Sequence, residues 1–193
     1  MSARLLPAGG HVDMPWKNGL GRTTEIARAP ASGDGFDWRL SIASIDRDGA
    51  FSAFAGCDRT LVPIAGGGLA LDFDGGETLR GELFEPMRFA GDRPCFGRLL
   101  AGPARDLNVI TRRAAARHDV AILTGSTTQA TTGNVSFVVG VYGSLTIATN
   151  DGRWRLDVGD ALRIDGHGVA LRLMAISEPA RAALVSIALR PPP

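Results

Sequence analysis

The sequence runs Ile64-Ala-Gly-Gly-Gly-Leu-Ala-Leu-Asp-Phe-Asp-Gly75, and 76 residues later it runs Gly140-Val-Tyr-Gly-Ser-Leu-Thr-Ile-Ala-Thr-Asn-Asp151. In both stretches, apolar residues alternate with small or polar ones, which is the period of a half-buried strand. Each strand signal ends at a turn signal, Asp-Gly-Gly in the first stretch and Asn-Asp-Gly in the second. The two stretches therefore predict two similar β-hairpins.

The rest of the chain follows the same rhythm of short strands and tight turns. It holds 25 glycines and 11 prolines between short apolar runs, and helical windows are few. Such a weak repeat is typical of a double-stranded β-helix, the cupin barrel, in which closure removes exposed strand edges. We therefore predict an all-β bicupin, two tandem cupin-like barrels in one compact unit. Residues 1–113 form the first barrel with an N-terminal motif loop, and residues 114–193 form the second.

Composition and charge exclude several classes of protein. Among 193 residues, 21 basic and 20 acidic side chains give a net charge of +1, whereas nucleic-acid binding needs a strong basic excess. No apolar run approaches the length of a transmembrane helix, and the first residues lack the apolar core of a signal peptide. We therefore expect a cytoplasmic protein that binds neither nucleic acid nor membranes.

A metal site or cofactor is also not expected. The three histidines, His11, His118 and His167, lie far apart, whereas a metal-bearing cupin needs two histidines a residue apart, then a glutamate and a later histidine. Cys57 and Cys95 match neither a zinc pattern nor a disulfide framework. The sequence thus predicts a barrel with no metal and no cofactor.

Polar residues gather in four stretches before residue 114. The segment Met14–Glu25 holds Lys17, which is the one lysine of the chain beside 20 arginines. The strand signal Trp38–Ala43 places Arg39 and Ser41 on one face, where an inward arginine would bind a carboxylate. The other two stretches are Phe54–Arg59 and Asp106–Arg113. For each stretch a solvated outer face, or a surface ion pair, is the alternative interpretation.

These four stretches together resemble the HutD/Ves family of bacterial proteins. The motifs are Trp16-Lys-Asn-Gly-x-Gly-x-Thr, Trp38-Arg-x-Ser-x-Ala, Phe51-Ser-x-Phe-x-Gly-x-Asp-Arg and Asp106-x-Asn-Val-x-x-Arg-Arg, in that order. Leu20 stands where the family usually has glycine, and Ile110 stands where methionine is common. The resemblance implies a bicupin without the cupin metal ligands, linked to histidine utilisation. It implies no established catalytic mechanism.

We expect the polar residues of the first barrel to converge on one ligand pocket. Arg112 and Arg113 point to opposite faces of a strand, and we favour Arg113, with Arg112 as the alternative. The predicted ligand-binding residues are Trp16, Lys17, Asn18, Arg39, Ser41, Asp58, Arg59, Asn108 and Arg113. Such a cationic, hydrogen-bonding set suits a small carboxylate metabolite of histidine breakdown, of the urocanate or formylglutamate type.

Three functional hypotheses remain open at this point. The first is a metabolite-binding accessory or regulatory protein, which explains the polar residues best. The second is a metal-independent enzyme acting on a small carboxylate, with Lys17, Asp58 or Asp106 as acid or base. The third is an interaction protein whose polar strands are solvated. No distinctive nucleophile–base pair occurs, so a non-enzymatic role is favoured, and a homodimer stands as an alternative to a monomer.

Overall fold

A computed structural model describes residues 2–16, 19–33 and 35–191. Within these ranges the chain is built from strands, and a 3-10 turn at Ala8–Gly10 (η1) is the one helical element. The structure divides into two units: residues 12–116, called the first barrel below, and residues up to 11 together with those from 117 on, called the second barrel. In the described part of the chain, no helix has the length and apolar character needed to cross a membrane.

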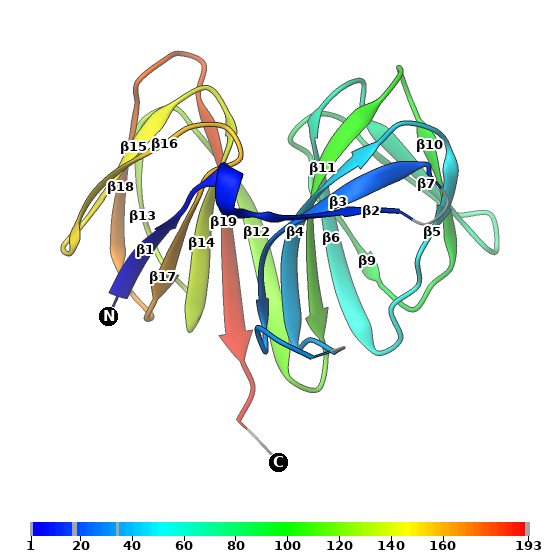
Figure 1. The fold of residues 1–193 in the computed structure, drawn as a ribbon, viewed down its shortest axis with the longest axis horizontal. Coiled ribbons are helices and arrows are strands. Elements are labelled where there is room, and N and C mark those ends of the chain that lie inside the picture. Colours follow the sequence, from blue (N-terminus) through cyan, green and yellow to red (C-terminus); the bar gives the residue numbers. More distant parts are fainter. Residues whose placement is uncertain (1, 17–18, 34, 192–193) are drawn as a thin grey trace. The chain divides into compact units, whose positions relative to one another are not determined.

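The first barrel consists of two antiparallel sheets that pack face to face (Figure 1). The six-stranded sheet has the order β2 (Val12–Pro15), β3 (Gly21–Ala29), β4 (Trp38–Ile45), β11 (Ala104–Arg112), β6 (Cys57–Ala65) and β9 (Met87–Ala90). The four-stranded sheet has the order β5 (Gly49–Phe51), β10 (Cys95–Leu99), β7 (Leu69–Phe73) and β8 (Thr78–Gly81). The first quoted stretch forms the β7–β8 hairpin as predicted, and Gly75 and Gly76 take positive φ angles of 100° and 88° in its turn.

The second barrel repeats this arrangement. Its five-stranded sheet has the order β1 (Ser2–Leu6), β17 (Ala161–Asp165), β14 (Val135–Tyr142), β19 (Arg181–Leu189) and β12 (Ala116–Thr124). Its four-stranded sheet has the order β13 (Thr127–Ala130), β18 (Ala170–Ala175), β15 (Leu145–Thr149) and β16 (Gly152–Leu156). The second quoted stretch forms the β15–β16 hairpin. Strands β4 to β11 therefore correspond one to one, in order and in sheet position, with strands β12 to β19.

A shared irregularity aligns the two barrels residue by residue. The pairing of β11 with β6 shifts register between Arg105 and Asp106, and the pairing of β14 with β19 shifts between Gly140 and Tyr142. Superposing these β-bulges matches the central strands of the two barrels. Asp106 then corresponds to Ala182, Asn108 to Leu184, Leu61 to Val138, and Arg59 to Ser136.

The predicted division of the chain needs a correction at its start. The boundary predicted after Arg113 lies close to the observed one after Ala116. The first residues, however, belong to the second barrel, because β1 pairs along its whole length with β17, from Ser2 opposite Asp165 to Leu6 opposite Ala161. Residues 1–113 therefore do not form one unit.

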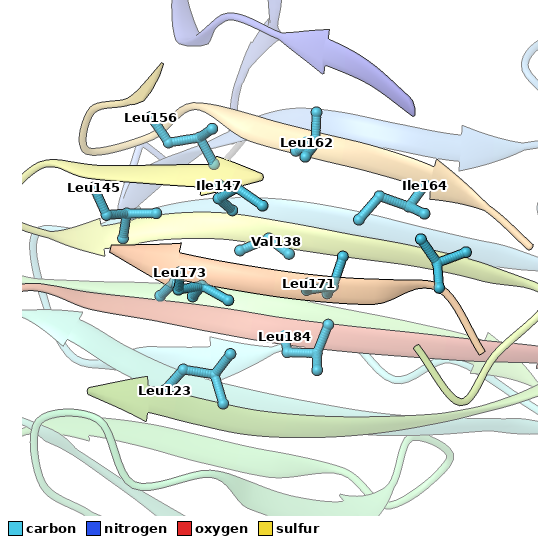
Figure 2. Close-up of a cluster of buried hydrophobic side chains, with 12 residues drawn as sticks. Leu123, Val138, Leu145, Ile147, Leu156, Leu162, Ile164, Leu171, Leu173 and Leu184 are labelled. Carbon is cyan, nitrogen blue, oxygen red and sulfur yellow. The ribbon is translucent and has the colours of Figure 1, made fainter. Parts of the chain in front are cut away.

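The two interiors differ in what fills them. The second barrel is packed with aliphatic side chains from both of its sheets, as Figure 2 shows. Its cluster comprises Leu123, Val138, Leu145, Ile147, Leu156, Leu162, Ile164, Val169, Leu171, Leu173, Ala182 and Leu184. The cluster in the first barrel is smaller and includes aromatic residues: Ala43, Ile45, Leu61, Leu69, Leu71, Phe73, Met87, Phe89 and Cys95. The remaining interior of the first barrel combines polar side chains with aromatic ones.

Candidate functional site

The strand register brings the polar residues of the first barrel to one face of the six-stranded sheet. Asn108 on β11 lies opposite Ser41 on β4, and Ile110 lies between Arg39 on β4 and Arg59 on β6. Since side chains on a strand alternate between faces, residues two apart share a face. Asp106 and Asn108 on β11 therefore point the same way as these two arginines.

These side chains line a cavity of about 420 Å³ in the first barrel. The volume lies within the range of roughly 300–1,000 Å³ that is usual for small-molecule sites. Polar groups and aromatic rings share its wall, which consists of Pro15, Trp16, Thr23, Arg39, Ala43, Ala50, Phe51, Ser52, Phe54, Arg59, Asp106 and Asn108.

Arg59 is a buried cation held among aromatic rings. Arg59 is only 5% exposed. Its guanidinium carbon lies 5.8 Å from the ring centre of Phe51, 5.1 Å from that of Phe54 and 5.2 Å from that of Phe89. One terminal nitrogen donates to the backbone oxygen of Ser52 at 3.1 Å, and the other donates to Asn108 Oδ1 at 3.5 Å. Burial lowers the pKa of Arg59 to about 10, so the group stays protonated at neutral pH.

Arg39 approaches the cavity from the other side of Ile110. Its guanidinium carbon lies 5.8 Å from the ring centre of Phe54 and 5.6 Å from that of Phe36. Its Nε lies 3.8 Å from Glu25 Oε2, which is an ion pair without a hydrogen bond. Burial lowers the pKa of Arg39, and the nearby Glu25 carboxylate partly offsets that effect. Both arginines therefore contact the ring of Phe54, and the cation–π attraction stabilises them there.

Asp106 is a buried carboxyl group in the cavity wall. The residue is 1% exposed, and neither carboxyl oxygen has a hydrogen-bond partner among the described residues. Burial raises the pKa of Asp106 to about 7, although the positive charge of Arg59 acts in the opposite direction. The sequence predicts Asp106 and Asn108 on one strand face and offers Asp106 as an acid or base, but Asp106 is not among the predicted ligand-binding residues. Its place two residues before Asn108 on an alternating strand is the signal that assigns it to the same face.

An aromatic wall at the start of the six-stranded sheet borders the cavity. Trp16 Nε1 donates to Thr23 Oγ1 at 2.8 Å, and the ring of Trp16 meets that of Phe51 edge-on at 6.3 Å between centres. A side chain at Gly21 would collide with the backbone oxygen of Ser44 and press on the ring of Trp16. The second glycine of the first motif thus permits the close approach of strand and ring.

Four of the nine predicted ligand-binding residues line this cavity: Trp16, Arg39, Arg59 and Asn108. Ser41 lies on the same strand face but is fully buried, and its hydroxyl has no hydrogen-bond partner among the described residues. Lys17 and Asn18 lie outside the described residues. Five further residues of the cavity wall were not among the predicted ligand-binding residues, although each stands in one of the four motifs: Thr23, Phe51, Ser52, Phe54 and Asp106.

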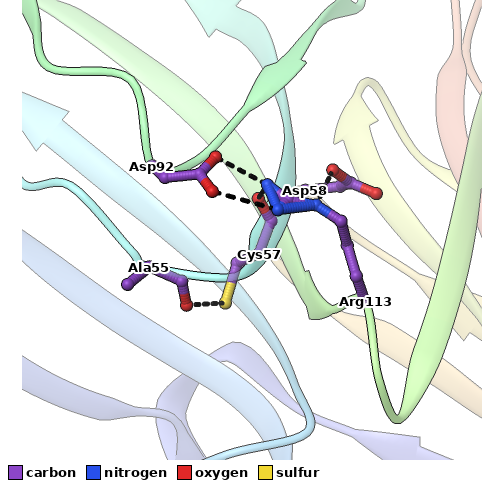
Figure 3. A network of polar contacts seen from close by, with 5 residues as sticks. All are labelled: Ala55, Cys57, Asp58, Asp92 and Arg113. Carbon is purple, nitrogen blue, oxygen red and sulfur yellow. Dashed lines mark hydrogen bonds and ion pairs between the residues drawn. The ribbon is translucent and has the colours of Figure 1, made fainter.

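The expected convergence is wrong for Asp58 and Arg113, which lie in a separate polar network (Figure 3). Arg113 Nε donates to Asp58 Oδ1 at 2.9 Å, and its terminal nitrogens donate to Asp92 at 3.0 Å and 2.6 Å. A further hydrogen bond of 3.0 Å reaches the backbone oxygen of Cys57. Bonding by its own backbone N–H and then by Arg113 lowers the pKa of Asp92.

The ends of the strands explain this correction. β11 ends at Arg112, so the alternation of faces does not continue to Arg113, whose backbone N–H donates to the oxygen of Gly56. Asp58 is next to Arg59 on β6, and neighbouring residues on a strand point to opposite faces. Arg112 lines a second, more open depression together with Phe36, Phe54 and Cys57. Within the described ranges, no group of three His, Cys, Asp or Glu side chains could hold a metal ion.

Comparisons with known proteins agree with the fold and the motifs. A match to an uncharacterized 21.2 kDa protein in the hutC 3' region of Pseudomonas putida is 44% identical over 108 residues, which is 55% of this chain and 57% of that protein. Protein Ves of Citrobacter koseri is 35% identical over 155 residues, covering 79% of this chain and 74% of Ves. The chain therefore matches less than two thirds of the Pseudomonas putida protein.

Solved structures also resemble this chain in fold. The structure of HutD from Pseudomonas fluorescens SBW25 superposes with a TM-score of 0.85 and 32% identity, covering 98% of this chain and all of that chain (100%). A cupin 2 conserved barrel domain protein from Leptotrichia buccalis superposes with a TM-score of 0.56 at 8% identity, covering 86% of this chain and 88% of that one, a likeness of fold alone. The HutD family model matches residues 8–182. This all-β cupin chain therefore belongs to the HutD family.

Proposed function

We propose that this protein binds a small carboxylate metabolite in the cavity of the first barrel and serves as an accessory or regulatory protein of histidine degradation. The observation that carries the proposal is the pair of guanidinium groups, Arg39 and Arg59, which line one cavity and contact one ring. Guanidinium groups bind carboxylates through charge-assisted hydrogen bonds, and a partly dry cavity strengthens them.

The charge balance of the cavity supports an anionic ligand. Among the described residues, Glu25 is the one carboxylate within 4 Å of either arginine. Asp106, whose pKa is about 7, is only partly ionised at neutral pH. The cavity therefore carries a net positive charge when it is empty, and a buried charge that lacks a full partner is costly. A bound carboxylate would supply the missing negative charge.

The link to histidine degradation comes from relatives. The Pseudomonas putida relative is named by its position beside hutC, and the Pseudomonas fluorescens structure is that of HutD. Carboxylates of this pathway, such as urocanate and formylglutamate, are therefore the first ligands to test. Their size fits a cavity of about 420 Å³.

Calorimetric titration of urocanate and formylglutamate into the purified protein tests the proposal. We expect saturable binding of at least one carboxylate, no binding of its uncharged primary amide, and weakening by Arg39→Ala of about 10- to 100-fold. Arg155→Ala, in β16 of the second barrel, is the matched control, because Arg155 pairs with Asp157 away from the cavity. Absence of binding, or equal binding by wild type and Arg39→Ala, contradicts the proposal.

A metal-independent enzyme acting on the same carboxylates is the second candidate. The observation in its favour is Asp106, since a carboxyl group whose pKa lies near the working pH suits general acid–base catalysis. Loss of urocanate absorbance during incubation would show turnover. If turnover disappears in Asp106→Asn while binding remains, the enzyme hypothesis replaces the binding role.

A further inference from the structure

The cavity has a cationic end and a carboxyl end. Arg39 and Arg59 pair with Ile110 of β11 from the two neighbouring strands. Asp106 precedes Ile110 by four residues on β11. At about 3.3 Å per residue, the backbone positions are separated by ~13 Å along the strand. The arginine side chains bend toward Phe54 and Asn108, so Asn108 lies between the guanidinium of Arg59 and the carboxyl of Asp106.

Among the described residues, Asp106 has no hydrogen-bond donor at that end. Its neighbours across the sheet are Ala43 on β4 and Pro63 on β6, neither of which carries a side-chain donor. Thr23, opposite Ala43 on β3, accepts a hydrogen bond from Trp16 and makes none with Asp106. A buried carboxyl group without a hydrogen bond is costly and uncommon in folded proteins. A ligand that enters the cavity can provide the donor that the described side chains do not.

We propose that Asp106 accepts a hydrogen bond from an N–H group of the ligand, so that the protein selects small molecules with a carboxylate at one end and an amide or azole N–H at the other. This inference rests on the proposed carboxylate binding and adds a specificity-determining residue to it. The carboxylate binds at Arg39 and Arg59, and the N–H group reaches Asp106 past Asn108.

The arrangement couples ligand binding to protonation. An N–H donor favours the ionised form of Asp106, so binding lowers the pKa of Asp106 from its value of about 7 in the empty cavity and releases a proton near neutral pH. Arg59 on β6 is the charged group that acts on Asp106. Arg39 on β4 lines the cavity as well, and it forms an ion pair with Glu25 on β3. A carboxylate without an N–H group would instead favour protonated Asp106 and take up a proton.

Two matched probes separate these cases. Urocanate and 3-(2-furyl)acrylate are both planar acrylates, but a furan ring has no N–H group. We expect wild type to bind urocanate roughly 10- to 100-fold more tightly, which is the usual effect of a hydrogen bond to a charged group. Asp106→Leu should remove this preference by weakening urocanate alone, and Asp58→Asn, outside the cavity, should preserve it. Calorimetry of formylglutamate, whose amide does not titrate near neutral pH, in two buffers of different ionisation enthalpy should show proton release.

Each outcome decides the inference. Equal affinity of wild type for the two probes, a preference that persists in Asp106→Leu, or proton uptake with formylglutamate overturns the role of Asp106 and leaves carboxylate binding standing. Binding of neither probe contradicts the proposed function, and the inference fails with it. If Asp106→Leu does not fold, the probe preference and the proton release of wild type still decide the question.

Discussion

The two barrels share one strand plan but use their interiors differently. With the β-bulges superposed, Asp106 and Asn108 of the first barrel correspond to Ala182 and Leu184 of the second. Ala182 and Leu184 belong to the apolar cluster that fills the second barrel, whereas Asp106 and Asn108 line the cavity of the first. A few differences at equivalent positions thus separate a packed core from a partly polar cavity on the same scaffold.

The comparison also indicates how a polar cavity lowers the stability of a barrel. Filling the second interior with aliphatic side chains removes apolar surface from water and leaves few voids. The first barrel gives up part of that stabilisation and buries an unpaired carboxyl group and two cations. Proteins commonly accept such local destabilisation where they bind ligands. The larger aliphatic cluster lies in the second barrel, while the proposed function belongs to the first.

A reciprocal exchange should give the largest effect. Leu184→Asn puts an amide into the apolar cluster, and we expect a loss of about 3–5 kcal/mol in unfolding free energy from lost burial and an unsatisfied polar group. Asn108→Leu, at the equivalent cavity position, should change stability by only about 1 kcal/mol, since it loses one long hydrogen bond and gains apolar burial. Urea denaturation followed by circular dichroism measures both, and equal losses would mean that the interiors are energetically alike.

Substitutions of the cationic residues test whether carboxylate affinity depends on the first barrel alone. Arg39→Lys should recover only part of the carboxylate affinity lost in Arg39→Ala, because an ammonium cannot make the two-pronged contact of a guanidinium. Lys17→Ala, predicted from the first motif, should weaken binding by about 10- to 100-fold. Arg163→Ala in β17 of the second barrel is the control and should leave calorimetric affinity unchanged. Weaker binding in that control would place the site elsewhere.

The buried carboxyl group should give the first barrel a pH-dependent stability. Because the folded-state pKa of Asp106, about 7, lies above the unfolded value, the folded chain holds a proton that the unfolded chain has released. The contribution of Asp106 to the unfolding free energy is therefore largest below about pH 4. It is lost as the pH rises through 7, at up to about 1.4 kcal/mol per pH unit. The unfolding free energy of wild type should therefore fall relative to Asp106→Asn between pH 5 and 7. Parallel curves would show that Asp106 ionises normally.

The network around Arg113 should have the smallest effect. Its ion pairs with Asp58 and Asp92 are substantially exposed, and exposed pairs contribute little to stability. We expect Arg113→Ala to lower the thermal unfolding midpoint by a few degrees at most and to leave carboxylate affinity unaltered. A large loss of affinity would return Arg113 to the site that the sequence predicted.

Local periodicity explains what the sequence could predict. The alternation of Trp38–Ala43 correctly placed Arg39 and Ser41 on one face of a strand, and the two hairpins correctly indicated the repeat. Alternation also explains the errors, since it applies only within a strand and gives neighbouring residues opposite faces. Asp58 is next to Arg59 on β6 and therefore points away from the cavity. Arg113 lies beyond the end of β11, where the alternation no longer applies.

Long-range features were beyond the reach of periodicity. No local sequence pattern can predict that β1 pairs with β17, because most of the chain lies between these two strands. Burial of Asp106 without a partner also contradicts the usual expectation that an interior carboxylate is paired. Its burial depends on how the two sheets of the first barrel close over β11, which no single strand determines.

The pairing of β1 with β17 has a consequence for the order of folding during synthesis. The ribosome makes β1 before any strand of the first barrel, yet the partners of Ser2 to Leu6 emerge only with residues 161–165. Domains generally fold as units while translation continues, so residues 12–116 can fold while β1 still waits for its sheet. During that interval β1 is an unpaired strand open to chaperones and to neighbouring nascent chains.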